Sequence, residues 1–127
     1  MQSNTVDEVG FHQPHASSVK EYAYTEDKNY KFRPQMEDVS AHKDRVNNDA
    51  SCGLFCVFDG HGGKQVADHC AERIPIELQK ELNKNPQELC NPIISVFDKI
   101  DNELRLIDGE MCGATACVAV IRREGNH

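Results

Sequence analysis

The feature that most constrains the fold is a short apolar run that ends in a glycine-rich polar turn. Residues 53–58 (GLFCVF) contain no charged side chain, and the sequence Asp59-Gly60-His61-Gly62-Gly63 follows directly. A continuous apolar run of this length is typical of a strand that is buried on both faces of a sheet. We therefore expect a strand over residues 53–58, with Asp59 held at the point where it ends.

The rest of the chain predicts two helices and three further strands. Apolar residues recur every four positions from residue 66 to residue 82, which predicts a helix that Pro75 should kink or break. A second helix is predicted to begin with Asn91 as its N-cap and Pro92 at its first position, and to stop at Asp108-Gly109. The further strands are expected over residues 17–25, 36–42 and 113–121, the last of them a central strand because it is small, β-branched and uncharged.

The order of these elements predicts an α+β domain. Two consecutive helices lie between the third and fourth strands, which fits α+β layering better than a regular βαβ series. Residues 1–16 are polar and aperiodic, so we expect a flexible N-terminal lead followed by the domain itself over residues 17–127.

Charge and cysteine usage limit the function classes. The net charge of -7 disfavours a nucleic acid or anionic membrane partner, because phosphate would be repelled; it fits a cation-binding cleft or simply a solvated surface. No apolar run approaches the roughly 18 residues of a spanning helix, and the first residues do not resemble a secretory signal. We therefore expect a cytoplasmic or nuclear protein whose six cysteines are reduced rather than paired or zinc-bound.

The first cluster with chemical potential follows the apolar run. A carboxylate fixed at the end of a strand, here Asp59, is a good ligand for a hard cation such as Mg²⁺ or Mn²⁺. Gly60 allows a close approach of the backbone, and its carbonyl is a further oxygen ligand. Histidine is a common proton donor in enzymes, so His61 can protonate a leaving group. The alternative is a glycine-rich turn with a solvated Asp and His.

The second cluster is Glu37-Asp38, preceded by Arg33. Neighbouring side chains on a strand point to opposite faces, so both carboxylates reach one point only through a twist or through water. Arg33 precedes Pro34, is held extended by it, and offers a planar fork that suits a phosphoryl group. The alternative is a surface ion cluster.

Three strings taken together resemble the opening motifs of the PP2C (PPM) family of metal-dependent serine/threonine protein phosphatases. They are RPQMED (residues 33–38), VFDGHGG (residues 57–63) and GATACVAVI (residues 113–121). The second string is highly specific, and the first lies upstream of it at a suitable distance. The third predicts close packing in a sheet, and from its residues alone we assign it no chemistry. The resemblance covers roughly residues 17–122.

The resemblance implies a fold and a reaction. The fold would be part of the family's α-β-β-α sandwich, in which two β-sheets are flanked by helices, with the later strands missing. Two Mg²⁺ or Mn²⁺ ions would lie between the sheets. Water activated by them would attack the phosphorus of phosphoserine or phosphothreonine in protein substrates.

The resemblance also implies a role for each site residue. Asp59 would bridge both ions, and the carbonyl of Gly60 would bind one of them. Glu37 and Asp38 would hold metal-bound waters. The remaining two residues, Arg33 and His61, would bind the phosphate and protonate the departing oxygen, respectively.

The later motifs of the family, a second Asp-Gly and a Gly-x-x-Asp-Asn, do not follow residue 121. Asp108-Gly109 precedes the last predicted strand and is no substitute. With an incomplete set of carboxylates, we expect a truncated chain to bind at most one ion weakly and to have little activity. This holds whether the chain is a truncated gene product, a splice form or a fragment of a longer enzyme. The alternative function is a non-catalytic module that binds phosphoproteins or a full-length phosphatase. The sequence predicts no oligomeric state.

Overall fold

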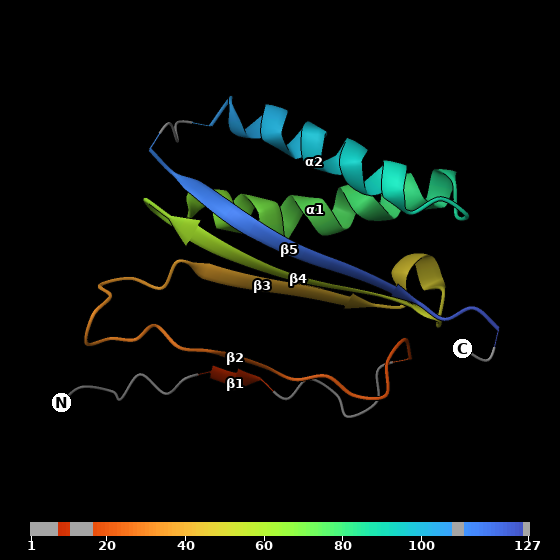
Figure 1. Cartoon of the computed structure of the whole chain (residues 1–127), viewed down its shortest axis with the longest axis horizontal. Helices are drawn as coiled ribbons and strands as arrows, with labels where there is room; N and C mark the ends of the chain where they lie inside the picture. The colour runs from red at the N-terminus through yellow and green to blue at the C-terminus, as the bar shows by residue number, and fades with distance from the viewer. Residues whose placement is uncertain (1–7, 11–16, 108–110, 126–127) are drawn as a thin grey trace.

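The computed structural model describes residues 8–10, 17–107 and 111–125. In chain order, its elements are β1 (Glu8–Gly10), β2 (Tyr24–Glu26), β3 (Asp38–Asp44), the 3-10 helix η1 (Val46–Asn48), β4 (Cys52–His61), α1 (Gln65–Lys84), α2 (Cys90–Leu104) and β5 (Gly113–Arg122). Figure 1 shows the two helices on one side, the sheet of β3, β4 and β5 in the middle, and the short β1–β2 ribbon on the other side. Helices combined with an antiparallel sheet confirm the predicted α+β class.

The three-stranded sheet has β4 at its centre. Both β3 and β5 pair with β4 in antiparallel fashion, which places Asp38 opposite Asp59 and Asp59 opposite Thr115. The strand predicted over residues 113–121 is confirmed as β5, but within the described part of the chain it lies at the edge of the sheet. Its small residues indicated close packing between strands, and a single neighbour, β4, satisfies that packing.

The central strand is longer and less buried than its apolar run predicts. β4 covers residues 52–61, so Asp59 lies inside the strand rather than at its end. Phe58 is fully buried, whereas its neighbour Val57 is 56% exposed. The prediction of burial on both faces is therefore wrong for the described residues, because successive side chains alternate between a face covered by helices and a face that is partly open.

The first two predicted strands differ from those observed. Only the last two residues of the strand predicted over 17–25 lie in β2, because the amides of Ser17 and Ser18 donate hydrogen bonds to the Asp44 carboxylate (2.7 and 3.0 Å) instead of to a neighbouring strand. β3 runs two residues beyond the predicted range 36–42 at its C-terminal end and begins two residues late. β3 begins and ends where its pairing with β4 begins and ends, and the local sequence does not indicate these positions.

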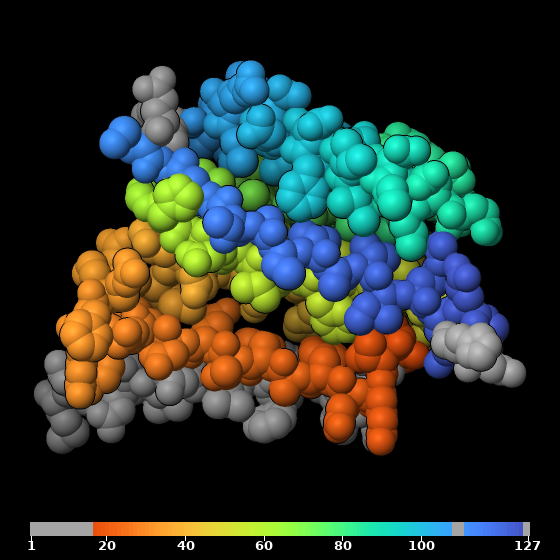
Figure 2. Space-filling model, viewed as in Figure 1, coloured from red at the N-terminus to blue at the C-terminus, as the bar shows by residue number. Residues whose placement is uncertain are grey.

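The N-terminal segment contributes a ribbon to the molecule. β1 pairs with β2 in antiparallel fashion, so the described residues 8–10 of the predicted flexible lead form a strand. The other residues of the segment 1–16 lie outside the described residues, and the division into lead and domain stays a prediction. Figure 2 shows the segment that carries β2, in orange, along the side of the molecule away from the helices. On this side, the ring centroid of Tyr22 lies 5.0 Å from the ring centroid of His42 and 5.5 Å from that of Phe55.

The first predicted helix is confirmed as α1. Pro75 lies inside it, and the helix continues without a break for nine further residues. A proline removes one backbone hydrogen bond, but the turns around it are held by the burial of Ile74 and Leu78, each 1% exposed. The side-chain amide of Gln79 also donates a hydrogen bond to the carbonyl of Pro75 (3.0 Å).

The second predicted helix is confirmed as α2, with a different start. It begins at Cys90, and the Glu88 carboxylate accepts hydrogen bonds from the amides of Cys90 (3.0 Å) and Asn91 (3.5 Å). Asn91 is therefore the second helical residue and not the N-cap, because a carboxylate from the preceding turn satisfies the first free amides. The helix ends at Leu104. The predicted stop at Asp108-Gly109 lies outside the described residues.

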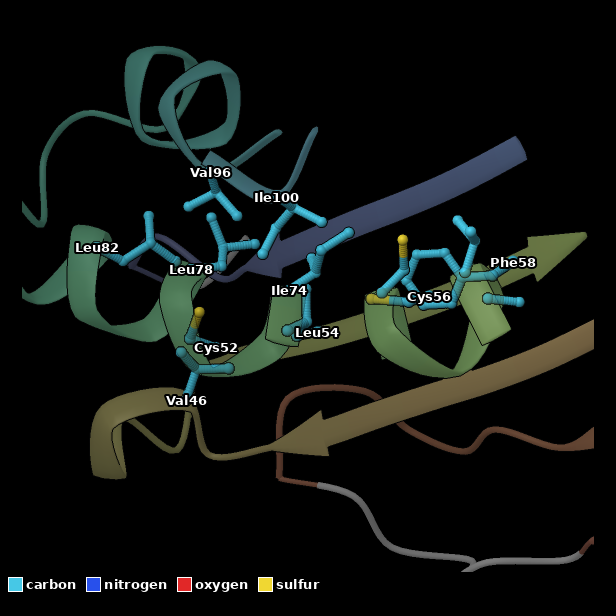
Figure 3. Packing of buried hydrophobic residues seen from close by; sticks show 13 residues of the cluster. Val46, Cys52, Leu54, Cys56, Phe58, Ile74, Leu78, Leu82, Val96 and Ile100 are labelled. Atoms are coloured by element: carbon cyan, nitrogen blue, oxygen red, sulfur yellow. The ribbon is translucent and has the colours of Figure 1, made fainter. Parts of the chain in front are cut away.

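The hydrophobic core lies between the helices and one face of the sheet. Figure 3 shows side chains of β4 pointing toward those of α1, with α2 packed above them. The largest fully buried side chains are those of Phe58, Leu54, Ile74, Leu78 and Val96. Burial of each such side chain contributes roughly 1.5–3 kcal/mol, so this layer supplies most of the stabilisation of the described fold.

A network of ion pairs joins α1 to α2. Glu77 of α1 is 2% exposed and accepts hydrogen bonds from Lys99 of α2 (2.6 Å), Arg73 (2.8 Å) and Lys80 (3.1 Å). These bonds, first that from Lys99, lower the pKa of Glu77 to about 2. Arg73 also binds Glu103 of α2 at 2.9 Å. A buried carboxylate with three cationic donors fixes the relative position of the two helices.

Two further expectations concern the whole chain. None of the six cysteines forms a disulfide in the structure. The thiol of Cys56 is buried on the helix face of β4, and this burial raises its pKa to about 12. In the described part of the chain, neither helix has the length and apolar character that crossing a bilayer requires.

Candidate active site

A polar cleft of about 300 Å³ lies where one end of the sheet meets the turn that joins β2 to β3. Each of the sequence-predicted site residues lines it: Arg33, Glu37, Asp38, Asp59, Gly60 and His61. The clusters around residues 33–38 and 59–61, which are far apart in the sequence, therefore come together. The antiparallel pairing of β3 with β4 is the cause, because it brings the start of β3 beside the end of β4.

Two carboxylates face each other across the strands at this cleft. Asp38 of β3 and Asp59 of β4 are directly opposite in the register, so their side chains share one face of the sheet. Partial desolvation, then the charge and a hydrogen bond of Asp59, raise the pKa of Asp38, while the positive charge of Arg33 opposes the shift. Two such carboxylates repel each other unless a proton or a cation lies between them.

Glu37 occupies the cleft from outside the sheet. It precedes β3, so the alternation of side chains along a strand does not separate it from Asp38. Its carboxylate accepts a hydrogen bond from the amide of Gly63 (2.8 Å), and its carbonyl accepts one from the amide of Gly60 (3.0 Å). Glu37 therefore connects the start of β3 to the glycine-rich turn after β4.

Gly60 is required by a close approach of two backbones. A Cβ atom at this position would lie 2.5 Å from the carbonyl oxygen of Glu37 and 3.2 Å from the Cβ of Ala67 on α1. Any larger residue would push β4 away from β3 or from the helix. The glycine thus keeps Asp59 at its position opposite Asp38.

His61 lies at the C-terminal end of β4, two residues after Asp59 and on the same face of the strand. It is exposed and pairs with Gly113 of β5. A Cβ atom on Gly113 would lie 2.5 Å from Nε2 of His61, so a larger residue there would force the imidazole ring to move.

Two residues of β5 were therefore not foreseen from the sequence. Gly113 sets the space for His61, although its string was read as structural only. Thr115 is exposed and lies opposite Asp59, which completes a row of Asp38, Asp59 and Thr115 across the sheet. Only the strand register reveals these neighbours, and the register is a long-range property.

The donor set fits a divalent cation in part. In the described part of the chain, no group of three or more His, Cys, Asp or Glu residues is arranged to hold a metal ion. The facing oxygens of Asp38 and Asp59 nevertheless have the hard-ligand chemistry of Mg²⁺ or Mn²⁺ sites, and a cation would offset the repulsion between them, which adds to desolvation in raising the pKa of Asp38. The arrangement is an incomplete carboxylate shell.

A larger groove of about 530 Å³ lies between the two helices and β5. Its lining is mostly apolar, with Asp101 and Arg105 as its charged groups. This groove has a single carboxylate in its lining, whereas the smaller cleft has four, so the smaller polar cleft is the better candidate for chemistry.

Comparison with known proteins matches most of the described chain to one family. The family model described as protein phosphatase 2C matches residues 22–125. Protein phosphatase 2C homolog 1 of Schizosaccharomyces pombe is 30% identical over 125 residues, which cover 97% of this chain and 36% of the yeast protein. Protein phosphatase 2C 56 of Arabidopsis thaliana is 30% identical over 112 residues, which cover 70% of this chain and 26% of the plant protein.

A third relative matches a shorter stretch. Probable protein phosphatase 2C 21 of Oryza sativa subsp. japonica is 39% identical over 74 residues, or 58% of this chain and 21% of the rice protein. The chain thus spans between 21% and 36% of the length of these relatives. Its helices and antiparallel sheet are consistent with part of the family's fold.

Proposed function

Because the chain belongs to the protein phosphatase 2C family, we propose that its function is the metal-dependent hydrolysis of phosphoserine and phosphothreonine in proteins. The observation that supports this most is the meeting of Asp38, Asp59, Arg33 and His61 at one cleft. The four side chains provide two cation ligands, a phosphate-binding group and a proton donor.

Each side chain has a defined task in this reaction. Arg33 binds the phosphoryl oxygens through its planar fork and steadies their charge as the bond to phosphorus changes. A water oxygen forms a bond to phosphorus, and the bond from phosphorus to the serine or threonine oxygen breaks. His61 donates a proton to that departing oxygen, and the proton that the attacking water releases restores the one His61 has given up, so the products are phosphate and a free hydroxyl.

The carboxylates and one backbone carbonyl of the cleft are the groups that would bind a cation. Asp59 and the carbonyl of Gly60 would bind Mg²⁺ or Mn²⁺ directly, and Glu37 and Asp38 would bind through water. Bound there, the ions would lower the pKa of water and offset charge on the phosphoryl group. Asp59 is central to this role, because it is the residue that the register places against Asp38.

The test is turnover by the chain itself. Purified chain is incubated with a small aryl phosphate or a phosphothreonine peptide at millimolar Mn²⁺, beside Asp59→Asn and the control Asp98→Asn, an exposed carboxylate of α2. We expect slow turnover that Asp59→Asn lowers roughly 100-fold or more and Asp98→Asn leaves unchanged. Equal turnover by all three proteins would contradict the proposed role of the cleft.

A second candidate function is a non-catalytic module that binds phosphoproteins. It is favoured by the incomplete carboxylate shell in the described residues. In the same experiment it predicts no turnover, with phosphothreonine peptide binding that depends on Arg33. Absence of both turnover and binding would contradict both functions. A cytoplasmic or nuclear location stays a prediction.

A further inference from the structure

A short turn carries Arg33 into the cleft. In Figure 1 it belongs to the orange loop that joins β2 to β3. The Asp27 carboxylate accepts a hydrogen bond from the amide of Asn29 (2.7 Å), whose backbone is left-handed with φ 55°. The carbonyl of Asn29 then accepts hydrogen bonds from the amides of Phe32 (2.9 Å) and Arg33 (3.1 Å). The backbone of Arg33 is therefore tied to that of Asn29.

The same turn brings a second cation to the cleft. Lys28 lines the cleft together with Arg33, and Lys28 is half-buried. Among the described residues, neither cation forms an ion pair within 4.0 Å, although Glu37, Asp38 and Asp59 line the same cleft. Two cations are thus held on one turn beside a group of carboxylates, neither of them within ion-pair distance of one, although the charge of Arg33 acts on Asp38.

A phosphoryl group matches this arrangement of donors. It carries close to two negative charges and three acceptor oxygens, and a guanidinium binds two of those oxygens at once. The compact charge of a lysine suits the third oxygen, which the fork of Arg33 leaves free. We propose, on the basis of the proposed function, that Lys28 is a second phosphate-binding cation that acts together with Arg33.

The acidic side of the cleft determines the conditions of the test. Four carboxylates line the cleft against its two permanent cations, the fourth being Asp27. Free phosphate would be repelled by this balance, so its binding should depend on Mg²⁺ at the carboxylates. The probe is therefore inorganic phosphate, added to the full chain at saturating Mg²⁺ and followed by backbone amide chemical shifts in NMR spectra.

The informative variant is Lys28→Gln, with Lys31→Gln as its control. Lys31 lies three residues further along the same turn, is exposed, and does not line the cleft. We expect Lys28→Gln to weaken phosphate binding roughly five- to tenfold, Lys28→Arg to retain most of the affinity, and Lys31→Gln to change it less than about twofold. The spectra also show whether each variant is folded.

Arg33→Gln separates failure of this inference from failure of the proposed function. If Arg33→Gln weakens phosphate binding and Lys28→Gln does not, the role of Lys28 is overturned and the cleft remains a phosphate site. If the unsubstituted chain binds no phosphate with Mg²⁺ present, both the inference and the proposed function are overturned. Equal losses in Lys28→Gln and Lys31→Gln would also overturn the role of Lys28, because they would indicate a general charge effect.

Discussion

The two faces of the sheet differ in how completely they are packed. The face toward the helices buries the large side chains of β4, as Figure 3 shows for Leu54 and Phe58. On the opposite face, Val57 is 56% exposed and Ile121 is 43% exposed. The candidate cleft opens on that second face, through Asp59. The core side chains and the candidate site residues are therefore alternate residues of one strand, and substitutions should separate their effects.

The largest expected effect is a loss of stability on the helix face. Phe58→Ala removes a fully buried ring and leaves a cavity against α1, so we expect the free energy of unfolding to fall by roughly 3–5 kcal/mol. Val57→Ala, one residue earlier and on the open face, should cost less than about 1 kcal/mol. Urea denaturation followed by circular dichroism measures both. Similar losses at the two positions would show that the open face is as well packed as the helix face.

The second largest effect on stability is expected in the ion network that joins α1 to α2. Glu77→Gln leaves Arg73, Lys80 and Lys99 without their shared carboxylate, and we expect the Tm at pH 7 to fall by roughly 5–10 °C. Glu81→Gln is the control, because Glu81 forms one pair with the exposed Lys84. It should lower the Tm by less than about 2 °C.

The pH dependence of this effect follows from the pKa of Glu77. Its folded value of about 2 lies below the ordinary 4.5, so its contribution to stability is full above about pH 4.5 and is lost as the pH falls toward 2. The difference in Tm between the unsubstituted chain and Glu77→Gln should therefore shrink over this window. A difference that stays constant from pH 7 to pH 2.5 would contradict the depressed pKa.

The smallest effect on stability is expected on the open face, at Gly113. Gly113→Ala places a Cβ where it meets the ring of His61, so the imidazole must move. We expect a loss of about 1 kcal/mol and a shift of the NMR signals of the His61 ring. Thr115 is on the same strand and is exposed. Thr115→Ser should change neither the free energy of unfolding nor the NMR signals of the His61 ring. If the His61 signals stay in place in Gly113→Ala, the contact does not fix the ring.

Local patterns in the sequence were sufficient to predict the elements that carry the core. The four-residue repeat of α1 and the apolar run of β4 both correspond to observed elements, because periodicity and composition directly reflect burial of the helix face. They did not show that Val57 is exposed, since exposure depends on what covers a strand and not on the strand itself.

The site was predicted as a set of residue types and not as an arrangement. The motifs around Arg33 and Asp59 named side chains that line one cleft, and their roles in a reaction stay a prediction. The pairing of Asp38 with Asp59 and the contact of Gly113 with His61 depend on strand register, which follows from the whole sheet. The break of a predicted strand at Ser17 and Ser18 has a similar cause, because their partner, Asp44, is distant in the sequence.

A titration of the chain with Mg²⁺ tests the role of Asp59 on the open face most directly. Isothermal calorimetry at pH 7 compares the unsubstituted chain with Asp59→Asn and with Asp98→Asn, a carboxylate on the exposed side of α2. We predict weak binding that Asp59→Asn reduces at least about tenfold and Asp98→Asn leaves unchanged. Equal Mg²⁺ affinity in the unsubstituted chain and Asp59→Asn would contradict a cation site formed by the facing carboxylates.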